Sequence, residues 1–169
     1  MKINKNITFL FDRDGVLNKD LGHPWKISQL KLMHQTKKVL KLLLDKKIKA
    51  YVISNQSVIG RGLCRLSDVN KFNKMINDNI NKNKKVIKKF YICPHHPILA
   101  LGKYKKKCKC RKPNNELILK AIKENNLSKK NLVMIGDKKS DYLCAKKSKI
   151  YFEYRKYNFY NQILSILKK

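Results

Sequence analysis

The sequence predicts an α/β protein with a doubly wound, mostly parallel sheet, and two observations lead to this prediction. Short apolar runs alternate with longer segments whose apolar residues recur at helical spacing. Polar residues of types that can take part in catalysis directly follow three of the apolar runs. Alternating strands and helices favour a parallel, Rossmann-like sheet that is covered on both faces and binds ligands at the carboxyl ends of its strands. The 169 residues suit one domain, which we expect to span 1–169.

Taken in chain order, the first element is the apolar run ITFLF at 7–11, which predicts a buried strand. Residues 36–47 carry a helical stripe of apolar side chains, and KAYVI at 49–53 predicts the second strand. Apolar residues at helical spacing over 67–81 predict a helix with Ser67 as its N-cap.

The second half of the chain continues the alternation. KKFYI at 88–92 and LVMIG at 132–136 predict strands on either side of a helix at 115–126. The remaining elements are expected to be a short helix, a strand and a final helix, at 140–147, 149–154 and 158–168. One long irregular segment remains, at 96–110, and loops of that length are usually functional or braced.

The composition restricts the classes of function. The net charge of +30 comes from 36 Lys and only 5 Arg against 11 acidic residues. Such a charge suggests a nucleic-acid partner, yet Arg, which nucleic-acid readers favour, is rare, and the lysines are spread along the whole chain. We interpret the excess as the bias of an AT-rich genome. No apolar run reaches 18 residues and the first residues do not resemble a signal peptide, so we expect a cytoplasmic protein without a membrane or nucleic-acid partner.

Four of the eleven acidic residues gather in two short segments, FDRDG and MIGDKKSD. Asp12 follows the first strand and is suited to attack phosphorus, while Asp14 is suited to protonate a leaving alkoxide and later to deprotonate water. Asp137 ends the fourth strand and would face Asp12, and two carboxylates beside a phosphate need a cation, for which Mg²⁺ fits. Gly15 permits a sharp turn beside the ligand. Capped polar turns are the alternative interpretation of these segments, and an exposed helical position is the alternative for Asp141, which otherwise could orient Lys112 or a metal-bound water.

Two further segments supply groups that stabilise phosphate. Ser54 ends the second strand and offers a hydroxyl, although a turn or cap hydroxyl is commoner for a lone Ser. Lys112 would neutralise charge on a transferring phosphoryl group, and the fork of Arg111 suits a phosphate. These side chains extend the predicted phosphate site beyond the carboxylates.

The segment CPHHP…CKC predicts a metal site of a different kind. Three Cys and one His form a set that suits a closed, tetrahedral structural Zn²⁺, and the metal would help to order a loop with little apolar content. The expected ligands are Cys93, His95, Cys108 and Cys110, with His96 as a neighbour that does not ligate. Incidental buried cysteines are the alternative.

Together, the four phosphate-handling segments resemble the haloacid dehalogenase superfamily of phosphatases over nearly the whole chain. The predicted zinc-binding segment at 93–110, called the zinc loop below, is directly followed by RKP. This combination resembles the subfamily of heptose bisphosphate and histidinol-phosphate phosphatases. DRDGVLNKD, SNQSVIGRG, CPHHP and CRKP are close to the motifs of the heptose enzymes, as is the span of twelve residues between His95 and Cys108. The resemblance implies release of the 7-phosphate of D-glycero-D-manno-heptose 1,7-bisphosphate, with histidinol phosphate as the alternative substrate.

The resemblance also implies roles for particular residues. Asp12 would be the nucleophile and Asp14 the acid/base, with Ser54 and Lys112 stabilising the phosphoryl group. Mg²⁺ would be held by Asp12, the backbone carbonyl of Asp14, and Asp137. The substrate-facing residues would be Arg13, Asp20, Leu21, Gly22, His23, Asn55, Gln56, Ser57, Arg111 and Lys138. No large cap domain is expected, so the zinc loop and residues 18–27 would shape specificity in a monomer acting on a small phosphorylated metabolite.

Two departures from the family pattern bear on substrate choice. The family's Gly-Tyr-x-His is here Gly22-His23-Pro24-Trp25, and His34-Gln35 stands where a Gly usually precedes the first helix. A non-enzymatic, zinc-containing protein that binds nucleic acid through its lysines is the alternative from another class. It predicts indifference to loss of Asp12.

Overall fold

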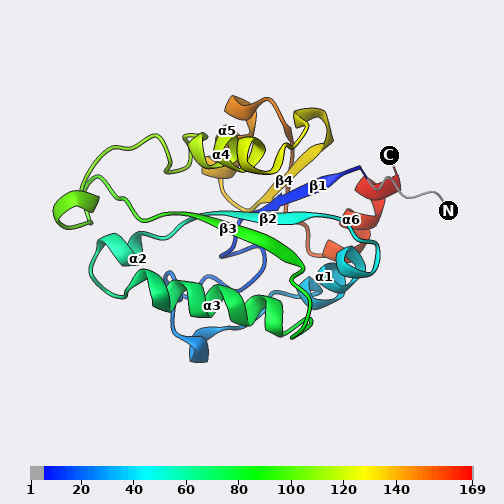
Figure 1. Cartoon of the computed structure of the whole chain (residues 1–169), viewed down its shortest axis with the longest axis horizontal. Coiled ribbons are helices and arrows are strands. Elements are labelled where there is room, and N and C mark those ends of the chain that lie inside the picture. The colour runs from blue at the N-terminus through cyan, green and yellow to red at the C-terminus, as the bar shows by residue number, and fades with distance from the viewer. Residues whose placement is uncertain (1–5, 169) are drawn as a thin grey trace.

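The computed structural model describes residues 6–168 and has a five-stranded sheet at its centre (Figure 1). The strand order is β3-β2-β1-β4-β5, and every neighbouring pair is parallel. The strands are β1 (Thr8–Phe11), β2 (Ala50–Asn55), β3 (Ile87–Cys93), β4 (Leu132–Gly136) and β5 (Tyr151–Tyr154). The predicted doubly wound parallel sheet is therefore confirmed, with β3 and β5 as its two edges.

Helices cover both faces of the sheet, as Figure 1 shows. One layer contains α1, α3 and α6, and the other contains α4 and α5. The helices are α1 (Thr36–Asp45), α2 (Ser57–Gly60), α3 (Leu66–Asp78), α4 (Glu116–Asn125), α5 (Lys139–Ser148) and α6 (Phe159–Lys168). The period of two along β1 divides its side chains between the layers, since Phe9 and Phe11 join the first core and Leu10 the second.

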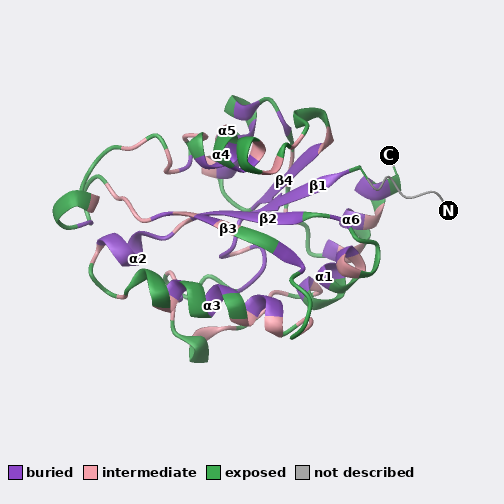
Figure 2. Cartoon of the chain, in the orientation of Figure 1, coloured by how far each residue is buried: buried purple, intermediate pink, exposed green. Residues whose placement is uncertain are grey.

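The central strands are buried on both faces, which explains why the sequence reads as continuous apolar runs there (Figure 2). The helices show the opposite pattern. In α1, only Thr36, Val39, Leu40 and Leu43 are buried, on the stripe that faces the sheet. Burial of these apolar faces, worth about 25 cal/mol per Å² of apolar surface, holds the layers together.

Two local expectations differ from the structure. The helix predicted from Ser67 begins at Leu66, so Ser67 lies inside α3 and does not cap it. The carboxylate of Asp68 accepts the backbone N–H of Arg65 at 2.9 Å instead, which satisfies a donor at the beginning of the helix. The short helix α2 was not predicted, because four residues are too few for an apolar period to emerge.

Among residues 6–168, no helix combines the length and the apolar character needed to cross a membrane. The predicted domain of 1–169 includes residues 1–5 and 169, which lie outside the described part of the chain.

Candidate active site

Polar residues at the carboxyl ends of three central strands, β1, β2 and β4, lie close together at one edge of the sheet. Asp12 follows β1, and its backbone N–H donates to the carbonyl of Ile135 in β4 at 3.0 Å. Ser54 lies near the end of β2, and Asp137 follows β4 directly. Because these strands are parallel and adjacent, their carboxyl ends meet at one edge of the sheet.

A cavity of about 190 Å³ lies at this edge. Its walls come from the ends of the strands, the loop after β1, the zinc loop and the beginning of α5. The lining residues are Asp12, Asp14, His23, Ser54, Asn55, Arg111, Lys112, Lys138 and Ser140. All but Ser140 were predicted, and its only signal in the sequence was its position within MIGDKKSD.

Lys112 occupies the centre of a buried charge cluster. Its Nζ lies 2.8 Å from Oδ1 of Asp12 and 2.6 Å from Oδ1 of Asp141, and it donates to the carbonyl of Ile53 at 2.8 Å. Burial alone would favour the neutral amine, but Asp12 and Asp141 together raise the pKa of Lys112. The ammonium group is therefore a fixed positive charge beside Asp12.

Asp141 is fully buried, which excludes the exposed helical position considered from the sequence. Its Oδ2 accepts the backbone N–H groups of Asp137 and Lys138 at 3.2 and 3.0 Å, at the beginning of α5. Its other oxygen contacts Lys112. Asp141 thus joins the beginning of the helix to the buried lysine, as expected of a residue that orients Lys112.

Asp12 and Asp141 also lie close to a third carboxylate, that of Asp137, in an arrangement suited to a hard cation. Oxygen atoms of Asp12, Asp137 and Asp141 all lie within 4.8 Å of one another. Burial raises the pKa of Asp12 to about 6, with Lys112 opposing the shift and Asp141 adding to it. Burial also raises the pKa of Asp137, where Lys138 opposes and Asp141 adds to the shift. Carboxylate oxygens gathered in this way fit Mg²⁺.

Gly15 makes this arrangement sterically feasible. Its φ is +84°, in the region that favours glycine. A Cβ atom built on Gly15 would lie 2.2 Å from Oδ2 of Asp137. The predicted sharp turn is present, and the missing side chain leaves space for the carboxylate of Asp137.

Arg13 differs from the expected position on the substrate pocket. Its side chain is fully buried and does not line the cavity. The guanidinium instead donates to both oxygens of Asp14, from Nε at 2.9 Å and from Nη2 at 3.0 Å. Arg13 lies within the FDRDG motif, but the sequence alone does not indicate the direction of its side chain.

The other residues expected to face the substrate differ in whether they reach the cavity. His23, Asn55, Arg111 and Lys138 line the cavity. Gln56 and Ser57 are buried and do not line the cavity, and Leu21 is about half exposed. Asp20 and Gly22 form one turn with His23, in which the carboxylate of Asp20 accepts the backbone N–H groups of Gly22 and His23 and pairs with Lys138 at 2.9 Å.

The four predicted zinc ligands come together beside this site. The thiol of Cys110 lies 2.9 Å from that of Cys93, 3.4 Å from that of Cys108 and 3.2 Å from Nδ1 of His95. All four ligating atoms lie within 4.8 Å of one another, which is compatible with tetrahedral Zn²⁺. His96 is outside this cluster, and its Nδ1 accepts the N–H groups of Ile98 and Leu99.

Comparison with known proteins agrees with this arrangement. Residues 81–153 match the family model described as haloacid dehalogenase-like hydrolase. A D-glycero-beta-D-manno-heptose-1,7-bisphosphate 7-phosphatase from Haemophilus ducreyi is 34% identical over 85% of this chain and 78% of its own. An enzyme of the same name from Helicobacter pylori is 33% identical over 88% of this chain and 82% of its own.

A similar solved structure is the D,D-heptose 1,7-bisphosphate phosphatase from B. bronchiseptica, complexed with magnesium and phosphate. It has a TM-score of 0.75 and 18% identity, and the match covers 94% of this chain and 87% of that one. This likeness shows the fold, and the curated relatives show the family. The chain belongs to the heptose-1,7-bisphosphate 7-phosphatase family of haloacid dehalogenase-like hydrolases.

Proposed function

We propose that this chain hydrolyses the 7-phosphate of D-glycero-D-manno-heptose 1,7-bisphosphate through an aspartyl-phosphate on Asp12. The observation that carries the proposal is the small cavity in which Asp12 lies against the buried Lys112, with Asp137 nearby. The names of the relatives from Haemophilus ducreyi and Helicobacter pylori support the choice of substrate.

The proposed reaction has two steps that share one acid/base. In the first, a carboxylate oxygen of Asp12 bonds to phosphorus, the bond from phosphorus to the sugar oxygen breaks, and the proton of Asp14 goes to that oxygen. In the second, water attacks phosphorus and gives its proton to Asp14, and the bond from phosphorus to Asp12 breaks. Lys112 and Ser54 stabilise the negative charge on the phosphoryl oxygens.

Asp12, Asp137 and the backbone carbonyl of Asp14 are the proposed ligands of Mg²⁺. When bound, the ion supplies positive charge that offsets the repulsion between these carboxylates and a phosphate dianion. The fit rests on oxygen atoms of Asp12 and Asp137 within 4.8 Å of each other and on the space that Gly15 leaves.

Zn²⁺ is proposed at Cys93, His95, Cys108 and Cys110, with a structural role. Cys110 directly precedes Arg111 and Lys112, so ordering the cluster also orders two side chains of the cavity. The amide of Asn55 adds to this effect, because it bonds the backbone N–H and carbonyl of Lys112 at 3.0 and 3.1 Å. We infer that zinc loop and phosphatase core form one domain.

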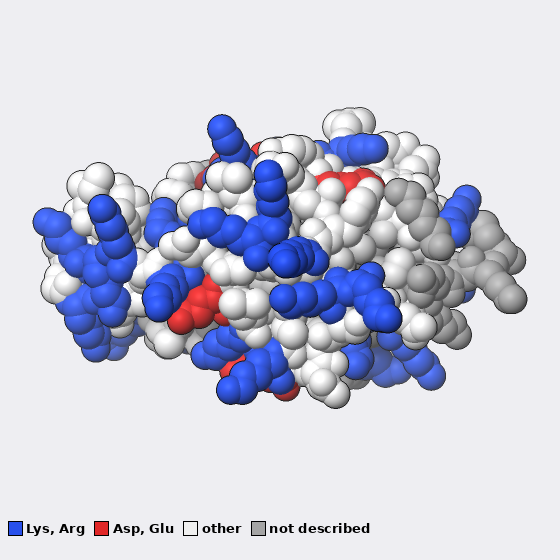
Figure 3. All heavy atoms as spheres, turned by 90° about the horizontal axis from the view of Figure 1, so that it is seen from above, with Lys and Arg blue, Asp and Glu red and all other residues white. Residues whose placement is uncertain are grey.

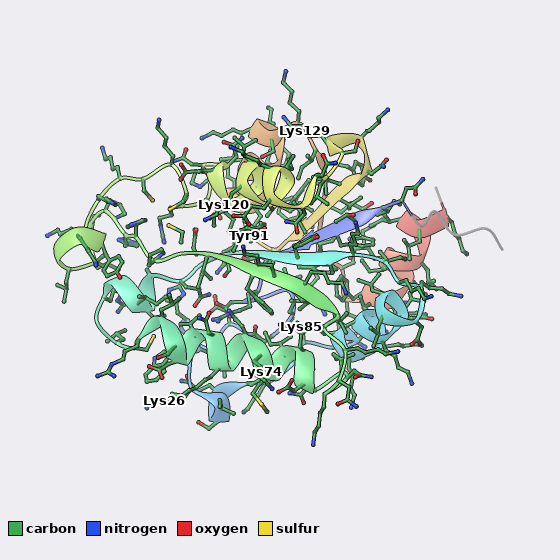
Figure 4. The ribbon with its side chains drawn as sticks, viewed as in Figure 1. Lys26, Lys74, Lys85, Tyr91, Lys120 and Lys129 are labelled. Atoms are coloured by element: carbon green, nitrogen blue, oxygen red, sulfur yellow. The ribbon has the colours of Figure 1, made fainter. Side chains whose placement is uncertain are left out.

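The second phosphate of the substrate is proposed to lie toward the zinc loop. A hollow of about 300 Å³ there is lined by Lys106, Lys107 and Arg111 among others, and it shares Arg111 and Lys112 with the catalytic cavity. Seven of the ten residues from 103 to 112 are basic, a density well above that of the chain as a whole. On the face drawn in Figure 3, Lys and Arg side chains are spread over the surface, and Lys74, Lys120 and Lys129, labelled in Figure 4, lie on different elements.

Histidinol phosphate is the second candidate substrate. The observation that favours it is the altered loop at His23, because a changed substrate-facing residue is compatible with a changed substrate. His23 lines the cavity with a φ of +65° in the loop whose sequence departs from the family pattern. A substrate with one phosphate and an imidazole would leave Lys106 and Lys107 without a phosphate partner.

The decisive experiment compares kcat/KM for the two substrates in the presence of Mg²⁺, for the unchanged protein and for Asp12→Asn. We expect preference for the heptose bisphosphate and loss of phosphate release in the variant. Preference for histidinol phosphate would replace the substrate, and equal activity of the variant would overturn the mechanism. A nucleic-acid-binding function predicts instead tight binding with a steep salt dependence that is indifferent to Asp12→Asn.

A further inference from the structure

We propose that Arg13 is a positioning residue that orients the carboxylate of Asp14. Through its contact with Pro24, it also couples this orientation to the position of the substrate-facing loop at residues 18–27. The inference rests on the function proposed above, in which Asp14 is the acid/base. Arg13 itself has no contact with the cavity and would act through Asp14 alone.

Four donors fix the carboxylate of Asp14. Oδ1 accepts from Nε of Arg13 at 2.9 Å and from the amide of Asn18 at 2.8 Å. Oδ2 accepts from Nη2 of Arg13 at 3.0 Å and from the amide of Gln56 at 2.9 Å. Two parallel bonds from a planar guanidinium fix the plane of a carboxylate as well as its position.

The guanidinium is in turn held from two other directions. In α3, Asn73 accepts from Nη1 at 3.2 Å, and the ring of Phe72 lies 4.6 Å from the guanidinium carbon. In the loop, the carbonyl of Pro24 accepts from Nη2 at 2.6 Å. One side chain therefore connects Asp14, α3 and the segment next to His23, so a shift of the loop is transmitted to Asp14.

Stability alone does not account for this buried pair. Desolvating two charges costs free energy that their attraction often fails to recover, and apolar residues of similar volume serve stability equally well. The side chain of Arg13 is fully buried, and that of Asp14 is nearly so. A rigid ion pair in this position is best explained by what it orients.

The test exploits leaving groups of different basicity. An alkoxide needs the proton of Asp14 in order to leave, whereas p-nitrophenolate leaves without it. With the alkyl ester glycerol 3-phosphate, we expect Arg13→Met to lower kcat by about 100-fold, because general acid catalysis contributes 10²–10⁴. With p-nitrophenyl phosphate, we expect rapid release of one p-nitrophenolate per enzyme. Later turnovers should be slow, because hydrolysis of the aspartyl-phosphate needs Asp14, in its correct orientation, as the base.

A second variant with a smaller change, Asn73→Leu, keeps the test valid if Arg13→Met does not fold. Asn73→Leu removes one hold on the guanidinium, whereas Asn77→Leu, one turn later on α3, removes two hydrogen bonds to Ile87 that have no connection to Asp14. Both asparagines are buried, so both changes should lower the stability of the fold. Only Asn73→Leu should change the ratio of kcat/KM for the alkyl ester to kcat/KM for the aryl ester, by about 5- to 10-fold for loss of one charge-assisted hydrogen bond. This ratio reports departure of the leaving group and does not include the later hydrolysis of the aspartyl-phosphate, which is common to both esters.

An equal loss of kcat/KM on both esters in Arg13→Met and Asn73→Leu would overturn the positioning role and leave a purely structural one. The proposed function has its own separate test, since Asp12→Asn should remove activity on both esters in an otherwise unchanged protein. If Asp12→Asn fails that test, the mechanism is wrong. If it passes and the ester ratio does not move, only the inference about Arg13 is wrong.

Discussion

The two clusters of ligating side chains lie side by side but are built by different physical means. Asp12 and Asp137 extend from buried strands, so the sheet places them by backbone hydrogen bonds and apolar burial. The cysteine and histidine cluster instead joins the end of β3 to a loop whose tip exposes Ile98, Leu99 and Leu101. The carboxylate cluster is preorganised by the fold, whereas the loop that carries the cysteine and histidine cluster would be ordered by the proposed Zn²⁺.

The two regions meet at Lys112. Its side chain enters the carboxylate cluster, while its backbone follows Cys110, the last of the proposed zinc ligands, by two residues. Damage to the first region should therefore act on chemistry and on core stability, and damage to the second on the precision with which Lys112 and Arg111 are placed.

The largest effect is expected from Asp141→Ala. It leaves the buried Lys112 with one carboxylate partner instead of two and removes an acceptor from the beginning of α5. Removing one partner of a buried pair costs about 3–5 kcal/mol. Urea unfolding should show this loss, whereas Asp78→Asn, which breaks an exposed pair with Lys74, should change stability by less than about 1 kcal/mol. Similar values for both would contradict a preorganised cluster.

Gly15→Ala should come next. The new methyl group would displace Asp137, and an error of about 1 Å in a catalytic group can lower the rate by about 100-fold. Gly102→Ala is the matched control, because Gly102 also has a positive φ but has nothing within 4 Å of the position of a Cβ. Steady-state kinetics should separate the two variants, and equal activity would mean that Asp137 tolerates displacement.

A smaller effect is expected from Cys108→Ser. Loss of one ligand should release zinc, measurable by elemental analysis, and reduce kcat/KM by about 10-fold, as disturbed metal shells commonly do. The far-ultraviolet spectrum should stay unchanged because the sheet does not depend on the loop. Cys64→Ser, which lies outside the cluster, should retain both zinc and activity. Collapse of the whole fold in Cys108→Ser would show that the two regions are not separable.

The smallest effect is expected from Lys149→Gly, at the opposite end of the helix that carries Asp141. Lys149 has a φ of +55°, and relief of that strain should stabilise the protein by about 1 kcal/mol. Lys146→Gly, inside the same helix and equally exposed, should destabilise it by a similar amount. Thermal unfolding measures both, and activity should stay unchanged because neither residue approaches a cluster.

The sequence contained the order of strands and helices because buried parallel strands and amphipathic helices have different periods. It also contained the residues that meet at the sheet edge, since Asp12, Ser54 and Asp137 each follow a strand. The direction of the Arg13 side chain could not be predicted from the sequence, because it depends on contacts with Phe72 and Asn73, which are far along the chain. The same limit applied to Ser140, because helical position alone does not distinguish a residue at a cavity from one in solvent.

Two departures from the family pattern fall where the backbone is most restricted. Gln35, which stands where a Gly is usual, has a φ of +60°, and His23 in the altered loop has a φ of +65°. Gln35 therefore adopts a left-handed conformation without being a glycine, whereas the altered loop retains its glycine as Gly22, with a φ of +76°. At Gln35 the side chain adds an acceptor for the backbone N–H of Tyr160 at 2.8 Å, which partly offsets the strain.

The two edges of the sheet have a consequence for behaviour at high concentration. An edge strand offers unpaired backbone groups to any other chain, and proteins commonly block such pairing with lysine. At one edge, Lys88 and Lys89 are exposed on β3, so a second copy pairing there would bring like charges together. At the other edge, β5 exposes Tyr151 and Tyr154 and contains no lysine. Aggregation through edge pairing is therefore opposed at β3, and β5 depends for its protection on the mutual repulsion of molecules that each carry a charge of +30.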